Sequence, residues 1–202
     1  MRILHLSDTH GCHRRLGNLP EADIVVHSGD FCMAGSEREA IDFLNWFCNL
    51  PYLHKIFICG NHDECLYGSD ITGLDSNVHY LCNSRIEIEG LKFYGVPMFF
   101  TDCFTDHQQH NYEAVPLDTD ILITHAPANG ILDLDGSIHL GSKDLLKKLD
   151  NLDLKAHLFG HVHARKGIET RLTPSGKTTI HSNGAIINAT YTATSIPNLI
   201  EL

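Results

Sequence analysis

The sequence predicts an α/β fold in which layered β-sheets are flanked by helices, and three observations support this prediction. Five short apolar runs, rich in β-branched or aromatic residues, have the length and composition of strands that are buried on both faces. Two segments have the apolar spacing of amphipathic helices. The later part of the chain contains alternating runs that are typical of antiparallel strands. Helices between buried strands, followed by antiparallel strands, favour sheets arranged in layers.

The five apolar runs share one property, because each of them ends on polar residues. In chain order they read RILHLSDTH, DIVVHSGD, KIFICGNHD, DILITHAP and KAHLFGHVH, at residues 2–10, 23–30, 55–63, 120–127 and 155–163. Taken alone, the GNHD of the third run would be an ordinary turn, because Gly, Asn and Asp are common turn residues. The repetition of such clusters at five strand ends predicts instead that their side chains share one site.

Two helices are predicted between the strands. Residues 36–50, SEREAIDFLNWFCNL, place apolar residues at helical spacing, and Ser36 with Glu39 forms a possible capping box at the start. The second helix is predicted over residues 142–152, SKDLLKKLDNL, with Ser142 as its N-cap. Both helices are expected to cover a sheet.

The remaining segments predict further strands and one long connection. Residues 82–95 alternate around Glu89-Gly90, a pattern that indicates a β-hairpin. The tail, residues 167–201, contains short alternating runs such as KTTIHSNGAIINATYTA that are expected to be strands. The stretch 97–119 has little periodicity, and it is interpreted either as an ordered active-site loop or as a plain excursion.

Length, charge and cysteine content limit the class of protein. A chain of 202 residues is expected to form a single domain, residues 1–202. The net charge of −10 argues against binding of long nucleic acid, which needs a basic surface. No apolar run approaches the roughly 20 residues of a membrane helix, and the start MRILHLSD lacks a signal-peptide pattern. Seven cysteines without a CxxC pair predict a reducing compartment, the cytoplasm.

The polar residues at the strand ends have the chemistry of a metal site. Open α/β sheets bind ligands at the carboxyl ends of their strands, so neighbouring strands would bring these residues to one edge. Alternate residues of extended chain point the same way, which would pair Asp8 with His10 and His161 with His163. Carboxylates and imidazoles without thiolates suit Mn, Fe, Zn or Co. The eight donors are Asp8, His10, Asp30, Asn61, His62, His125, His161 and His163. One ion could not use them all, whereas two ions that share a carboxylate would use seven.

In order, these motifs resemble those of the calcineurin-like metallophosphoesterases. The matching residues are Asp8-x-His10, Gly29-Asp30, Gly60-Asn61-His62-Asp63, His125 and Gly160-His161-x-His163. The flanking segments DTDILITHAPANG, KAHLFGHVH and INATYTATSIPNLIEL look most like the MPPED-type branch of small single-domain phosphoesterases. The resemblance implies a four-layer αββα sandwich, in which two mixed β-sheets are flanked by helices, with a dinuclear centre of two divalent metal ions (Mn, Fe, Zn, Co or Ni).

The family pattern also implies which residues hold each ion. One ion would be bound by Asp8, His10, Asp30 and His163, and the other by Asp30, Asn61, His125 and His161. Asn61 is informative because a neutral amide oxygen is an uncommon ligand. The segment GDFCMAG, residues 29–35, lacks the tyrosine ligand of purple acid phosphatases, which argues against a tyrosinate–iron site.

The mechanism implied by the resemblance is hydrolysis of a phosphate ester. Two cations about 3.5–4 Å apart can bind a phosphoryl group and lower the pKa of a bridging water, and the resulting hydroxide would attack phosphorus. His62 would contact the phosphate or protonate the leaving oxygen, and Asp63 would orient His62 and raise its pKa. Gly60 would allow a sharp exit from the strand.

Three functions remain open on the sequence alone. The first is a phosphodiesterase acting on a small phosphodiester, such as a cyclic nucleotide. The second is a phosphomonoesterase or a nuclease of the same fold, and the third is a non-catalytic metal-binding scaffold for protein interaction. His13 is a further candidate for substrate contact. The other histidines are expected in the core, in a solvated loop or in structural positions: His5, His27, His107, His110, His54, His79, His139, His157 and His181.

Overall fold

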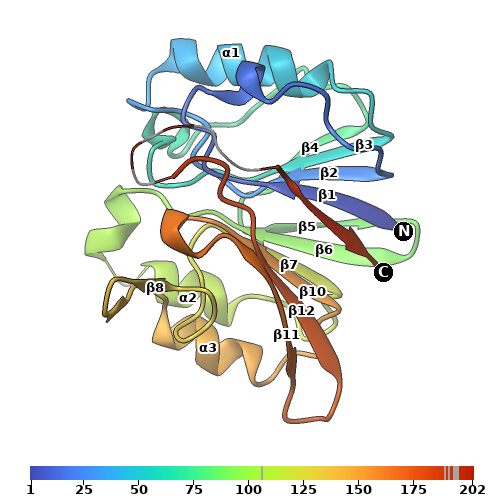
Figure 1. The fold of residues 1–202 in the computed structure, drawn as a ribbon, viewed down its shortest axis with the longest axis vertical. Helices are drawn as coiled ribbons and strands as arrows, with labels where there is room; N and C mark the ends of the chain where they lie inside the picture. The colour runs from blue at the N-terminus through green and yellow to red at the C-terminus, as the bar shows by residue number, and fades with distance from the viewer. Residues whose placement is uncertain (106, 189, 191, 193–195) are drawn as a thin grey trace.

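The computed structural model describes residues 1–105, 107–188, 190, 192 and 196–202. Two β-sheets pack face to face, and helices cover the outer face of each sheet, so that the fold has four layers (Figure 1). The predicted αββα sandwich of two mixed sheets is therefore confirmed. Among the described residues, no helix combines the length and apolar character needed to cross a membrane.

The first sheet has the strand order β13-β1-β2-β3-β4. Its strands are β1 (Arg2–Leu6), β2 (Ile24–His27), β3 (His54–Phe57), β4 (Val78–Tyr80) and β13 (Asn198–Glu201). The strands β1 to β4 are parallel, and β13 is antiparallel to β1. Both faces of β2 are apolar, because Val25 packs in the cluster that contains α1 residues and Ile24 and Val26 pack between the two sheets.

The second sheet has the order β11-β12-β10-β7-β6-β5. Its strands are β5 (Ser84–Ile88), β6 (Leu91–Val96), β7 (Ile121–Thr124), β10 (Ala156–Phe159), β11 (Gly167–Leu172) and β12 (Thr178–Asn183). The edge strands β5 and β11 are antiparallel to their neighbours, and the four inner strands are parallel. The predicted hairpin is confirmed as β5–β6. Glu89 and Gly90 both have positive φ, 49° and 79°, as a type I′ turn requires.

Helix α1 (Glu37–Cys48) begins with the predicted capping box: Ser36 accepts a hydrogen bond from the Glu39 N–H, and the Glu39 carboxylate accepts one from the Ser36 N–H. Its buried face consists of Ala40, Phe43 and Phe47, whereas Ile41 is 58% exposed. The helix therefore turns Phe43 and Phe47, rather than Ile41, toward the first sheet, because their large rings fill the space above it.

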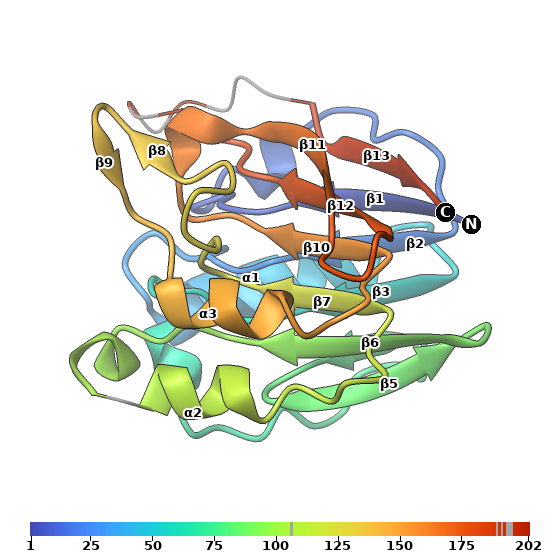
Figure 2. The same cartoon turned by 90° about the horizontal axis from the view of Figure 1, so that it is seen from below.

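Helices α2 (His107–Glu113) and α3 (Lys143–Leu149) lie side by side on the outer face of the second sheet (Figure 2). The predicted cap Ser142 accepts a hydrogen bond from the Leu145 N–H. The chain between these elements also forms a short hairpin, β8 (Leu134–Asp135) and β9 (Ile138–His139). Single-turn 3₁₀ helices occur at His13–Arg15, Glu64–Leu66, Thr101–Phe104 and His163–Arg165.

Several features differ from the sequence-based expectation. The five predicted strands belong to two sheets, with β1, β2 and β3 in one and β7 and β10 in the other. The stretch 97–119 contains helix α2, whose residues HQQHNYE have no apolar periodicity that could predict a helix. It is tied to the third motif by the Glu64 carboxylate, which accepts a hydrogen bond of 2.8 Å from the Phe100 N–H. Residue 106 of that stretch, and residues 189, 191 and 193–195 of the predicted tail, lie outside the described residues.

Candidate metal centre

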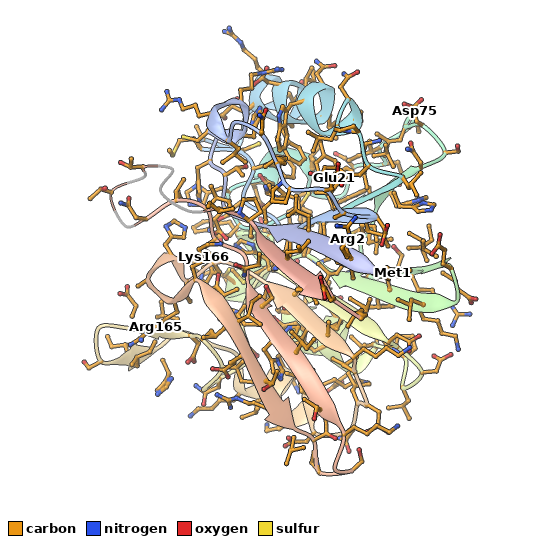
Figure 3. The ribbon with its side chains drawn as sticks, turned by 45° about the vertical axis from the view of Figure 1, so that its right-hand side comes forward. Met1, Arg2, Glu21, Asp75, Arg165 and Lys166 are labelled. Carbon is orange, nitrogen blue, oxygen red and sulfur yellow. The ribbon has the colours of Figure 1, made fainter. Side chains whose placement is uncertain are left out.

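The parallel strands of both sheets end on the same side of the molecule, opposite the chain termini (Figure 1). Arg165 and Lys166, which closely follow the fifth motif, lie at that side, far from Met1 (Figure 3). Backbone hydrogen bonds join the loops after β1 and β2: the Asp8 N–H donates to Gly29 O at 2.9 Å and the His10 N–H to Asp30 O at 3.0 Å. The motif residues therefore belong to adjoining loops.

The motif side chains are aimed by left-handed backbone. Asp8, His10, Asp30 and His161 have positive φ values of 52°, 39°, 58° and 68°. Each such non-glycine conformation costs on the order of 1 kcal/mol or more and persists only where the surrounding structure holds it. Of the two predicted pairs, Asp8 and His10 do share a group of ligand atoms, whereas His161 and His163 fall in different groups. Strand alternation explains neither result, because these residues lie beyond the ends of the strands.

Two glycines make room for the donors. A Cβ on Gly60 would lie 2.6 Å from Asp30 N and 2.6 Å from His125 Cε1, and one on Gly160 would lie 2.6 Å from Ser7 Cβ and nearer still to Asp8 Oδ2. Gly60 does not have a positive φ. Its place in the motif follows from lack of space rather than from the sharp exit that the sequence suggested.

The donor atoms form groups that share residues. Among the residues that the structure describes, ligand atoms within 4.8 Å of one another occur in Asp8, His10 and His163, in His10, Asp30 and His62, and in Asp30, His125 and His161. The Asp30 Oδ2 lies 3.3 Å from His125 Nε2 and 3.6 Å from His10 Nε2. Asp30 therefore stands between the first and the last group.

Asn61 completes the constellation. Its Oδ1 lies 3.1 Å from His125 Nε2 and 3.0 Å from His161 Nδ1. The structure thus brings all seven predicted ligands together, with His163 and His161 in different groups. Asp30 belongs to two of the three groups and lies 3.6 Å from His10 of the remaining one.

Asp8, His10 and His161 are in the protonation states that suit cation binding. Burial raises the pKa of Asp8, but His163 and His125 outweigh it and hold that pKa well below its usual range. Burial lowers the pKa of His10 and of His161 to about 4, so both imidazoles are neutral near pH 7. Ionised carboxylates and neutral imidazoles are the forms that bind metal ions.

The ring of His125 is held through the nitrogen that faces away from the other donors. Its Nδ1–H donates to the Ser28 carbonyl at 2.9 Å, which leaves Nε2 for the site. Burial lowers the pKa of His125, but the charges of Asp30 and Asp8 outweigh this effect and raise it to about 10. A cation at Asp30 would take the place of that proton.

His62 lies beside the donors and is fixed by main-chain atoms. Its ring Nδ1 is 2.8 Å from the Met33 carbonyl, and its main-chain N–H donates to Asp30 Oδ1 at 2.7 Å. The ring meets that of His10 edge to face, with 4.5 Å between the centroids. Because Nδ1 donates to a carbonyl, Nε2 is the nitrogen left to act on a ligand.

Asp63 does not have the predicted role of orienting His62. Its carboxylate accepts three hydrogen bonds of 2.8 Å from main-chain N–H groups, those of Asp30 and Gly60 on Oδ2 and that of Cys32 on Oδ1. Asp63 is fully buried. It therefore joins the loop of the second motif to that of the third, and the Met33 carbonyl orients His62.

Glu39 holds the segment that contains Met33, a role that the sequence did not predict. The Glu39 carboxylate accepts hydrogen bonds from the N–H groups of Met33 at 3.0 Å and Ala34 at 3.1 Å, in addition to its capping role. The spacing from Ser36 identified Glu39 as a cap, but no sequence pattern indicated that it also fixes the support of His62.

His13 lies beside the centre but is almost completely buried. Its Nε2 is 3.1 Å from Asp42 Oδ2, and its ring packs against Phe43 and Trp46. His5 and His27, expected in the core, are fully buried; His5 contacts Ser28 and Ser182, and His27 contacts Thr9.

Comparison with known proteins gives a consistent result. The family model for calcineurin-like phosphoesterases matches residues 1–165. A UPF0046 protein of Caenorhabditis elegans is 33% identical over 89% of the chain and 73% of its own length. The human metallophosphoesterase domain-containing protein 1 is 27% identical over the whole chain and 71% of its own length. One crystal structure aligns with a TM-score of 0.63 at 15% identity, over 90% of the chain and 89% of that structure, and shares the fold.

Proposed function

Because the chain belongs to the calcineurin-like phosphoesterase family, we propose that it is a metal-dependent phosphodiesterase that hydrolyses a small phosphodiester, with cyclic nucleotides as the first candidates. The proposal rests mainly on one observation, the convergence of seven carboxylate, imidazole and amide donors around Asp30. Such buried charges require partners, and a pair of divalent cations would supply them.

The proposed ligand sets keep the assignment of the family pattern. Asp8, His10, Asp30 and His163 would hold one ion, and Asp30, Asn61, His125 and His161 the other. The donor chemistry fits Mn, Fe, Zn, Co or Ni, because it combines oxygen and imidazole ligands without thiolate. When bound, two such ions bind phosphoryl oxygens and lower the pKa of a water.

The chain's own residues would then position and protonate the substrate. His62, with Nδ1 on the Met33 carbonyl, would present Nε2 to the phosphate or to the leaving oxygen as a general acid. Asp63, through its three main-chain hydrogen bonds, would keep the second and third motifs in register. Both are therefore proposed as functional residues, one in contact with substrate and one in a positioning role.

The substrate and setting follow from charge and composition. A net charge of −10 disfavours long nucleic acid, whereas a small phosphate ester needs only the local positive charge of the ions. The seven cysteines are all free thiols. We place the enzyme in the cytoplasm, where thiols stay reduced.

The test is hydrolysis by protein loaded in turn with Mn, Ni, Co, Zn or Mg. We expect release of p-nitrophenol from bis-p-nitrophenyl phosphate, loss of this activity with a chelator, and turnover of at least one cyclic nucleotide. Turnover confined to p-nitrophenyl phosphate would replace the proposal with a phosphomonoesterase, and turnover confined to oligonucleotides with a nuclease. Metal binding without any hydrolysis would favour a scaffold.

The shared ligand is tested separately by Asp30→Asn. We expect the metal content, measured by elemental analysis, to fall from two ions per chain. Asp70→Asn, which removes an exposed carboxylate that lies outside the five motifs, is the matched control and should keep both ions. Two ions retained in Asp30→Asn would contradict the assignment of Asp30 to both sets.

A further inference from the structure

A cavity opens beside the donor cluster, over the first turns of helix α1. Its volume is about 780 Å³, large enough for a small organic ligand. It begins at His10, a predicted ligand, and at Met33, whose carbonyl holds His62, and it extends along α1 to Asn45. If a phosphoryl group binds at the donor cluster, the cavity is the space next to it that the organic group attached to its phosphorus could occupy.

The acidic side chains that line the cavity are not paired with all of its basic ones. Asp42 is paired with Arg14, which donates from Nη2 at 2.8 Å, and it also contacts His13. The Glu39 carboxylate is occupied by main-chain N–H groups. The two acidic groups of the lining are therefore already in use.

Arg15 and Arg38 also line the cavity, and both are exposed. Within the part of the chain that the structure describes, neither guanidinium has a hydrogen bond or an ion pair with another side chain. Arg14, which precedes Arg15, is by contrast paired with Asp42. Exposed arginines of this surface are therefore not all without an ion pair. Two cations thus face a cavity in a protein whose net charge is −10.

The cavity lining also has an apolar part. Met33 is 39% exposed and Ile41 is 58% exposed, and both belong to the lining. The cavity therefore adjoins the donor cluster and is lined by an apolar surface and two arginines. A ligand that matches it has a phosphoryl group, an apolar body and a second negative group.

We propose that this cavity binds the part of the substrate that is attached to the reacting phosphorus, and that Arg15 and Arg38 bind a second anionic group on that part. The inference deepens the proposed function, on which its first half rests. The guanidinium group binds both phosphate and carboxylate in bidentate geometry. The substrate class is therefore a phosphodiester whose organic part carries a second phosphate or a carboxylate.

Ligand binding tests the proposal without relying on turnover. The probes are two matched pairs: adenosine 3′,5′-bisphosphate with adenosine 5′-monophosphate, and 4-carboxyphenyl phosphate with phenyl phosphate. Affinity for metal-loaded protein is measured by calorimetry and by the fluorescence of Trp46, the single tryptophan, which packs against His13 in the cavity wall. Chromatography after each titration verifies that the ligand is intact.

We expect the ligand with the second anion to bind about tenfold more tightly in at least one pair, because two exposed charged contacts contribute modestly each. The advantage should shrink as salt is added, since exposed charges are screened. A preference in the first pair assigns the second group as phosphate, and one in the second pair as carboxylate. Equal affinities within both pairs would overturn the proposal.

The arginines are tested by Arg15→Gln, Arg38→Gln and the double variant. We expect the advantage of the second anion to fall in each single variant and to vanish in the double variant. Arg85→Gln, which removes the same charge from the lining of a different cavity, should retain the advantage. An advantage that survives in the double variant would contradict the assignment to Arg15 and Arg38.

The outcomes separate this inference from the proposed function. Hydrolysis of bis-p-nitrophenyl phosphate with equal affinities within both pairs would leave the phosphodiesterase standing and overturn the anion site. Absence of hydrolysis together with an advantage that depends on the arginines would support the anion site and refute the phosphodiesterase.

Discussion

Gly60→Ala tests whether close packing of the backbone sets the geometry of the metal centre. The added Cβ would lie 2.6 Å from Asp30 N and 2.6 Å from His125 Cε1. Ordinary contacts of a Cβ begin near 3.4 Å. One neighbour is a main-chain atom and the other is a ring whose Nδ1 is fixed on the Ser28 carbonyl, so neither can move alone.

The expected effect on metal binding is large compared with the effect on stability. Relief of the overlap requires a shift approaching 1 Å, whereas ligand distances at metal sites hold within about 0.2 Å. We therefore expect metal affinity to fall by at least the roughly 10–100-fold seen when the support of a ligand is removed. Overpacking of this kind destabilises by about 1–3 kcal/mol.

The assay compares Gly60→Ala with Gly136→Ala. Gly136 has φ of 56° and open space around its Cβ, so its substitution costs about 1–2 kcal/mol of backbone strain and leaves the centre untouched. Denaturant unfolding of chelator-treated protein gives the loss of stability, and calorimetric titration gives metal affinity. Unchanged metal affinity in Gly60→Ala, or an equal loss in Gly136→Ala, would refute the packing argument.

Three further predictions concern residues around the donors. His62→Ala should lower turnover of bis-p-nitrophenyl phosphate by about 10²–10⁴ while metal content stays at the wild-type level, and full activity would remove His62 from the mechanism. Asp63→Asn should lower the free energy of unfolding by about 1–3 kcal/mol, measured in urea, because the amide cannot accept all three buried N–H groups. Burial raises the pKa of Glu39, but hydrogen bonds from Ser36, Ala34 and Met33 outweigh it and lower that pKa from 4.5 to about 2. A carboxyl group with a depressed pKa stabilises the fold above pH 4.5, and this stability is lost as the pH falls toward 2. Glu39→Gln should therefore flatten the pH dependence of the urea midpoint between pH 4.5 and 2. An unchanged slope would contradict this contribution of Glu39.

The repeated unit of apolar run and polar end carried most of the correct prediction. It located β1, β2, β3, β7 and β10, and with them the seven residues that the structure brings together. The family resemblance drawn from these motifs is confirmed by the match over residues 1–165. The division of the strands into two sheets could not be obtained from the runs themselves, because a strand buried between a helix layer and another sheet has the same apolar pattern in either sheet.

Other features depend on contacts that leave no pattern in the sequence. Ile41 has the spacing of a buried helical residue, yet the rings of Phe43 and Phe47 occupy the core and leave it exposed. Asp63 follows His62 directly, which suggested a pair, whereas its carboxylate turns to main-chain N–H groups of another loop. Left-handed backbone at Asp8 and Asp30 is likewise set by the packing of loops, not by residue type.

The donors come from both sheets, and this has a mechanical consequence. Asp8, Asp30 and Asn61 leave the first sheet, whereas His125, His161 and His163 leave the second, and Asp8 lies 153 positions before His161 in the chain. Ions bound between them would cross-link distant segments, and a cross-link that closes a long loop restricts the unfolded chain as a disulfide does. Bound metal would thereby add a further link between the two sheets to the apolar packing and to the hydrogen bonds, such as that from His125 Nδ1–H to the Ser28 carbonyl, that already join them.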